Sequence, residues 1–243
     1  MTVVGQSEKS GCATGKSALP QLQTWPCTAQ SDALCQLRTS LGGLIIQIMT
    51  THVRYLTHPQ VKIDPALPVP TWGLSEVGRM RAEALANAGR LSGTTQIISS
   101  GELKAIETAN SIGRKLNITV EVKEMMHEND RSATGFLPPE EFEIVANQFF
   151  AQPHVSIRGW ERAIDAQLRI TREVEAVLAR KLTGDVLVVG HGAVGTLLFC
   201  HYSGFAIDRK YDQPAGGGHY FTLVKDGRHV LHPWRPMEYF PRA

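Results

Sequence analysis

The chain has 243 residues, with 25 lysines and arginines against 23 aspartates and glutamates, and 42% of its residues are hydrophobic. This length and composition are typical of one large globular α/β domain or two small ones. The formal net charge of +2 gives no support for a dedicated nucleic-acid binder or membrane-surface binder, because both need an excess of basic residues. The apolar run Leu44–Ile46 is too short to cross a bilayer.

Residues 1–48 differ in composition from the rest of the chain. They contain few charged residues, hold Cys12, Cys27 and Cys35, and show neither a strand nor a helix periodicity. We therefore expect a leader with little stable structure over 1–48 and a single domain over 49–243, with Met49 as an alternative start. A targeting peptide is the competing interpretation, but the leader has neither a basic segment followed by a long apolar stretch nor an Arg-rich amphipathic helix.

The four cysteines contain no CxxC pair, so neither a zinc ribbon nor a disulfide scaffold is indicated. This cysteine usage favours a reducing, cytoplasmic location. The histidines show no recognised metal-ligand spacing, and we expect no metal site.

From Met49 onward, strand and helix patterns alternate along the chain. The predicted strands cover 53–56, 96–100, 119–124 and 186–189, followed by a closing hairpin of 220–224 with 229–231. The predicted helices cover 75–88, 103–116, 140–150, 159–181 and 193–201. The longest helix has the apolar stripe Trp160, Ile164, Leu168, Val174 and Leu178.

Strands separated by helices predict an α/β fold, a three-layer sandwich whose mostly parallel central sheet carries helices on both faces. In such sheets, reactive residues gather at the carboxyl ends of the strands. This rule selects His58 after the first strand, Ser99 and Ser100 at the end of the second, and His191 after the apolar run. The third strand is followed by Met126, His127 and Glu128, which adds a carboxylate to the group.

Several of these segments resemble motifs of the histidine phosphatase superfamily, which includes the phosphoglycerate mutases. Thr57-His58-Pro59 stands where that family has Arg-His-Gly, and Leu74-Ser75 with Gly78 resembles its helix start. The segment from Ser99 to Ala109 resembles the second motif, with Lys104 in place of an arginine. Met126-His127-Glu128 and Val188–Gly192 match the acid motif and the second-histidine motif, so the resemblance covers nearly all of residues 52–231.

The resemblance implies a phosphoglycerate mutase-like fold and a cofactor-free, metal-independent reaction through a phosphohistidine. His58 would be the nucleophile, with its other ring nitrogen held by a backbone carbonyl. His191 would hydrogen-bond the phosphoryl oxygens in the transition state, and Glu128 would protonate the leaving oxygen. The expected substrate-binding residues are Thr57, Gln60, Lys104 and Gly192, of which Lys104 would supply positive charge and Gly192 begins a helix whose free N–H groups favour an anion.

The departures from the family pattern reduce the positive charge of the predicted pocket. Thr57 and Lys104 replace two arginines, and losing one such electrostatic donor typically slows an enzyme about 10²–10³-fold. Arg54 lies four residues before His58, about 13 Å away along an extended strand. Three other cations remain open as substitutes: Lys62, Arg131 and Arg158.

We therefore expect a phosphomonoester hydrolase of reduced activity whose partner is a small phosphorylated molecule. The alternative is a catalytically inactive relative that keeps the pocket as a phosphate-binding regulatory module, and a phosphoglycerate mutase is a third interpretation. Nucleic acid and membranes are not expected as partners, and the oligomeric state is left open.

Overall fold

A computed structural model describes residues 40–41, 44–45 and 50–241. Most of the predicted leader, together with Met49, lies outside these residues, so the boundary at residue 49 stays a prediction. Within the leader, the structure describes β1 (Ser40–Leu41) and β2 (Leu44–Ile45), which pair antiparallel.

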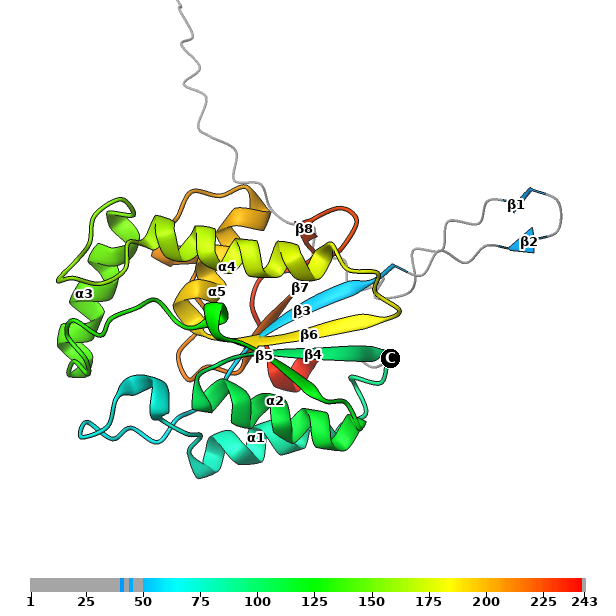
Figure 1. Cartoon of the computed structure of the whole chain (residues 1–243), viewed down its shortest axis with the longest axis horizontal. Coiled ribbons are helices and arrows are strands. Elements are labelled where there is room, and N and C mark those ends of the chain that lie inside the picture. The colour runs from blue at the N-terminus through cyan, green and yellow to red at the C-terminus, as the bar shows by residue number, and fades with distance from the viewer. Residues whose placement is uncertain (1–39, 42–43, 46–49, 242–243) are drawn as a thin grey trace, which may run out of the picture. The chain divides into compact units, whose positions relative to one another are not determined.

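The domain is organised around a seven-stranded mixed sheet whose path runs β5-β4-β6-β3-β7-β8, with β9 also paired to β7 (Figure 1). Its strands are β3 (His52–Thr57), β4 (Thr94–Ser100), β5 (Val120–Lys123), β6 (Asp185–Gly190), β7 (His219–Val224), β8 (His229–Val230) and β9 (Arg235–Pro236). The four strands β5, β4, β6 and β3 run parallel, while β7 is antiparallel to β3, β8 and β9. The predicted strands and the closing hairpin are thus confirmed.

Helices cover both faces of this sheet, which confirms the predicted three-layer α/β sandwich (Figure 1). One face carries α1 (Glu76–Asn87) and α2 (Leu103–Leu116), and the other carries α3 (Pro139–Ala151), α4 (Ala163–Leu178) and α5 (Gly192–Ser203). Helix α1 begins where the sequence predicted, because the Ser75 hydroxyl accepts the N–H of Gly78 at 3.1 Å as an N-cap.

Strand β6 shows how the sequence builds the two cores. Side chains alternate between the faces of a strand, so Val186 and Val188 enter the core beneath α3, α4 and α5. Leu187 and Val189 enter the core beneath α1 and α2. Because β6 is buried on both sides, it reads as a continuous apolar run, as parallel central strands do.

The longest predicted helix is shorter than the sequence suggested, and only part of its predicted apolar stripe faces the core from the helix. Arg158 and Gly159 have positive φ angles of 52° and 81°, so the backbone turns before α4 begins at Ala163. Trp160 packs in the core from this turn, whereas Leu168 is 54% exposed on the helix. Of the predicted stripe, Val174 and Leu178 do face the core from the helix, together with Ala163, Ala166, Ile170 and Val177.

The strand order brings the predicted reactive segments to one edge of the sheet. Strands β3 and β6 are parallel neighbours, and the His58 N–H donates to the Gly190 carbonyl at 3.0 Å. Strand β7 runs the opposite way, so its first residue, His219, meets the end of β3 at the same edge. Among the described residues, no helix is both long and apolar enough to cross a membrane.

Candidate active site

A pocket of about 800 Å³ opens at this carboxyl edge of the sheet. It is lined by His58 and Gln60 after β3, by Glu128 from the loop after β5, and by Gly192 at the start of α5. This volume suits a small organic ligand.

His58 is held in an orientation that suits a nucleophile. Its Nδ1–H donates to the Pro59 carbonyl at 2.8 Å, which leaves the Nε2 lone pair without a proton. Desolvation lowers the pKa of His58 from 6.5 to about 4, against the opposing effect of the Pro59 hydrogen bond. The imidazole is therefore neutral near pH 7, which is the form that attacks phosphorus.

His191 lies next to His58, and the two ring centroids are 5.3 Å apart in an edge-to-face arrangement. The backbone of His191 is clamped by the Tyr55 hydroxyl, which accepts its N–H at 3.0 Å and donates to its carbonyl at 3.1 Å. The ring is fully buried, and burial lowers the pKa of His191 well below its usual range. Its Nε2 lies 2.7 Å from the Ser100 hydroxyl, while Nδ1 has no hydrogen-bond partner among the described residues.

The Glu128 carboxylate caps helix α5. It accepts the N–H groups of Ala193 at 3.1 Å and Val194 at 3.0 Å, together with that of Asn129 at 3.1 Å. Burial raises the pKa of Glu128, while the positive charge of Arg131 and the N–H donors oppose that rise. Glu128 therefore occupies the first free N–H groups after Gly192, and only part of the helix N-terminus remains for the ligand anion that we predicted there.

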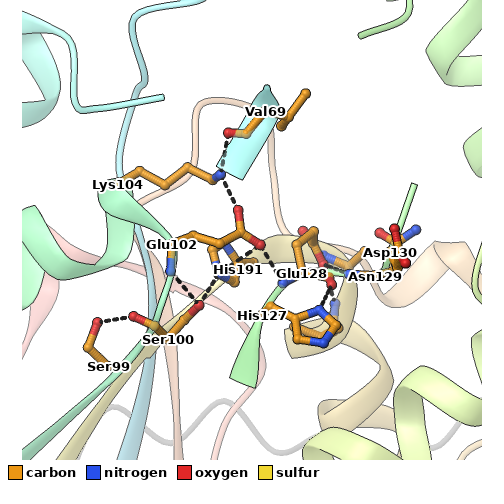
Figure 2. A network of polar contacts seen from close by, with 12 residues as sticks. Val69, Ser99, Ser100, Glu102, Lys104, His127, Glu128, Asn129, Asp130 and His191 are labelled. Carbon is orange, nitrogen blue, oxygen red and sulfur yellow. Dashed lines mark hydrogen bonds and ion pairs between the residues drawn. The ribbon is translucent and has the colours of Figure 1, made fainter. Parts of the chain in front are cut away.

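Glu102, at the N-terminus of α2, connects the parts of the site (Figure 2). One carboxylate oxygen accepts the N–H of Glu128 at 2.8 Å and lies 3.7 Å from His191 Nε2, and the other pairs with the Lys104 ammonium. Burial disfavours the carboxylate charge, but His191, Lys104 and the hydrogen bonds outweigh it and hold the pKa of Glu102 at about 2. Glu102 was not among the residues predicted from the sequence to form the site.

Lys104 does not supply free charge to the pocket wall, contrary to expectation. It is 3% exposed, its ammonium pairs with Glu102, and it also donates to the Val69 carbonyl at 3.1 Å. A lysine this deeply buried needs a counter-charge, and Glu102 provides it. Lys104 therefore joins α2 to the loop after β3 and holds Glu102 in place (Figure 2).

Thr57 is fully buried and lies behind the pocket wall rather than on it. Its hydroxyl accepts the His219 N–H at 3.0 Å and donates to Oε1 of Gln213 at 2.6 Å. The Gln213 amide nitrogen then packs against Gly192, where an added Cβ would come within 2.6 Å of it. Thr57 thus orients Gln213, a pocket-lining residue that no sequence motif indicated.

Gln60 lines the pocket and is fixed by Arg81 of α1, whose guanidinium donates to Gln60 Oε1 at 3.0 Å. The same guanidinium contacts the carbonyls of the turn Gly216–Gly218 and pairs with Glu238 at 2.7 Å. All three glycines have positive φ, and a Cβ on Gly217 would lie 2.4 Å from the His58 carbonyl. This glycine run is therefore a turn pinned by Arg81.

The loop that carries Glu128 is held by Arg169 of α4. Arg169 donates to the carbonyls of Met125, His127 and Glu128, and pairs with Glu161 at 2.7 Å. The Glu161 carboxylate in turn accepts the N–H of Asp130 at 3.1 Å. No group of three His, Cys, Asp or Glu side chains within the described part of the chain is arranged to hold a metal ion.

Comparisons with known proteins agree with this architecture. The model of the histidine phosphatase superfamily (branch 1) matches residues 69–228. The match begins after Thr57-His58-Pro59, so the divergent first segment lies outside it, whereas the segments around Lys104, Glu128 and His191 lie within it. No curated protein matches the chain.

Three solved structures illustrate this shared fold. Bacillus stearothermophilus YhfR is 22% identical, with a TM-score of 0.65 over 75% of this chain and 95% of its own. A mycobacterial glucosyl-3-phosphoglycerate phosphatase is 19% identical, with a TM-score of 0.61 over 77% of this chain and 97% of its own. A phosphoserine phosphatase of Entamoeba histolytica is 16% identical, with a TM-score of 0.62 over 76% and 96%.

Sequence identities this low show that the fold is shared and nothing further, but the family match spans over half of the chain. The chain therefore belongs to branch 1 of the histidine phosphatase superfamily.

Proposed function

We propose that this protein is a phosphomonoester hydrolase that works through a phosphohistidine at His58. The observation that carries the proposal is the hydrogen bond from His58 Nδ1–H to the Pro59 carbonyl, which leaves Nε2 as a fixed, neutral nucleophile in a pocket. In the first step, a bond forms between Nε2 and phosphorus while the phosphorus–oxygen ester bond breaks.

Glu128 acts as the acid of this step and the base of the next. The leaving-group oxygen takes the proton of the Glu128 carboxyl, whose raised pKa favours the protonated form before attack. A water molecule then gives its proton to the Glu128 carboxylate and attacks phosphorus, which breaks the nitrogen–phosphorus bond and releases inorganic phosphate. The three N–H donors at the carboxylate stabilise its charged form between the two steps.

His191 contributes its unpartnered Nδ1. The Ser100 hydroxyl already accepts the Glu102 N–H at 3.3 Å, so its own proton is free to bind His191 Nε2. In that tautomer, His191 carries a hydrogen on Nδ1. The ring is fully buried and does not line the pocket, so this donor would act on a phosphoryl oxygen from beside His58 as charge shifts in the transition state.

The substrate class that fits this site is a small phosphorylated metabolite, turned over without a metal ion. The named activities of two structural neighbours, a glucosyl-3-phosphoglycerate phosphatase and a phosphoserine phosphatase, support hydrolysis over a mutase reaction. A cytoplasmic location fits the single, buried and free cysteine among the described residues, Cys200.

The proposal is tested with the purified protein and its His58→Ala variant on a panel of phosphomonoesters that includes p-nitrophenyl phosphate. We expect burst release of product and an acid-labile phosphoenzyme in the wild type, and neither in His58→Ala. His52→Ala is a matched control, since this histidine lies at the opposite end of β3 beside Asp185. Phosphate binding with no turnover by the wild type would instead support the regulatory module, and transfer of phosphate between two positions of one substrate would support a mutase.

A further inference from the structure

Arg131 occupies the wall of the pocket together with His58 and Glu128. It follows Glu128 by three residues, in the loop between β5 and α3. Within residues 50–241, its guanidinium makes no hydrogen bond or ion pair, and its contacts are with two aromatic rings. The guanidinium carbon lies 5.0 Å from the Phe142 ring centroid and 6.0 Å from that of Trp160.

The other cations considered for this pocket are engaged or directed elsewhere. Arg54 pairs with Asp185 at 2.6 Å, at the far end of the sheet from His58. Lys62 is exposed and absent from the pocket wall. The remaining cations near the pocket are paired with carboxylates, namely Lys104 with Glu102, Arg158 with Glu141 and Arg209 with Glu143. Arg131 alone, among the pocket-lining cations of the described chain, has its charge free for a ligand.

The aromatic platform fixes this guanidinium without using its donors. Trp160 is 2% exposed, and its Nε1–H donates to the Thr134 hydroxyl at 2.9 Å, so the ring is fixed. The Arg131 carbonyl accepts the N–H groups of Thr134 at 3.1 Å and Gly135 at 3.0 Å, which fixes the backbone as well. An arginine stacked on aromatic faces keeps the N–H groups at its edge available, and those groups match the oxygens of a phosphoryl group.

We propose that Arg131 binds the phosphoryl oxygens of the substrate. It would thereby supply the positive charge of the family arginine whose position Thr57 occupies in this chain. This inference deepens the proposed function, because it assigns the anion-binding cation of the same pocket. The positive charge of Arg131 also opposes the burial that raises the pKa of Glu128, as expected if the two groups face the same reacting phosphate. Gln213, held by Thr57, adds a neutral amide donor beside Gly192.

The test compares Arg131→Met and Arg131→Lys with the wild type, with Lys62→Met as a control that removes one positive charge from an exposed residue of the loop after β3. The first readout is the affinity for inorganic phosphate and orthovanadate by calorimetry, which needs no turnover. We expect Arg131→Met to weaken both at least tenfold, Arg131→Lys to weaken them less, and Lys62→Met to stay within twofold. Intact folding of each variant is checked by its thermal unfolding curve.

The second readout is kcat/KM on p-nitrophenyl phosphate and on O-phosphoserine. We expect Arg131→Met to lower both by about 10²–10³-fold, since both share the phosphoryl group. A loss confined to phosphoserine would overturn the proposal, because Arg131 would then contact the carboxylate of the leaving group. Unchanged phosphate affinity in Arg131→Met, or a wild type that binds neither anion, would overturn it too. Lost anion binding in Arg131→Met with no turnover by any form would uphold Arg131 and refute hydrolysis instead.

Discussion

Glu102→Gln should destabilise the protein although it alters no atom of the hydrophobic core. The substitution keeps the size of the side chain and an oxygen that can accept the Glu128 N–H. It removes the negative charge that faces Lys104, whose side chain is almost completely buried. The variant therefore leaves an ammonium group inside the protein without a counter-ion.

The size of the effect follows from the ionisation of Glu102. Its pKa is lowered from 4.5 to about 2 in the folded protein, and one pKa unit corresponds to about 1.4 kcal/mol, so the carboxylate charge contributes at most about 3 kcal/mol near pH 7, where His191 is neutral. Removing one partner of a buried ion pair costs about 3–5 kcal/mol in general, which agrees. Because the folded pKa is depressed, this contribution is present above about pH 4.5 and is lost as the pH falls toward 2.

The assay is urea unfolding of the wild type, Glu102→Gln, Lys104→Met and the double variant at pH 7. With a slope of about 2 kcal/mol/M, a loss of about 3 kcal/mol moves the midpoint of Glu102→Gln down by about 1.5 M. The double variant should regain most of that loss, since neither charge is then buried alone. A loss below about 1 kcal/mol, or a double variant no more stable than Glu102→Gln, would refute the argument. The difference in unfolding free energy between the wild type and Glu102→Gln should also become smaller below pH 4.5.

Two further outcomes concern the reaction itself. Glu128→Gln should lower kcat/KM about 10²–10⁴-fold on alkyl phosphomonoesters, whose leaving oxygen needs a proton. The loss should be far smaller on p-nitrophenyl phosphate, because its phenolate leaves without a proton. Equal losses on both substrates would contradict the acid role of Glu128. The His58 imidazole, followed by NMR, should stay neutral as the pH falls from 8 to 5 and gain its proton near pH 4, because desolvation disfavours the charged ring. A midpoint near pH 6.5 would contradict this desolvation beside His191.

Most of the fold could be predicted from the sequence because its signals are local. The apolar run of β6 and the Ser75 cap of α1 each indicate a strand or a helix from only a few neighbouring residues. The start of α4 was missed because a turn at Arg158 and Gly159, with positive φ at both, precedes it, and periodicity does not register a backbone turn. The strand order was not predictable from local pattern, since pairing of β3 with β6 and β7 joins residues more than 130 positions apart.

The site residues that follow the carboxyl ends of strands could be predicted from the sequence. The roles that depend on contacts between distant side chains could not. His58, Glu128 and His191 come together at one edge because parallel strands place their carboxyl ends there. The ion pair of Lys104 was not predicted, since only the folded structure shows that Glu102 neutralises its charge. Gln213 carries no signal at all in the sequence, because its role comes from the Thr57 hydroxyl 156 residues away. Arg131 was one of three open candidates: Arg158 is paired with Glu141, and Lys62 is exposed and does not line the pocket.

The Arg81 clamp has a consequence for the order in which the protein is assembled. Arg81 joins Gln60, near the start of the domain, to Glu238, close to the C-terminal end of the described chain. The His58 carbonyl likewise accepts the N–H of Gly218 at 2.9 Å. During synthesis His58, the proposed nucleophile, is among the first parts of the domain to emerge, whereas the Gly216–Gly218 turn and Glu238 are among the last. The contacts of Arg81 with Gly217 and Glu238 can therefore form only late, and we expect the proposed hydrolysis to need this C-terminal part of the domain.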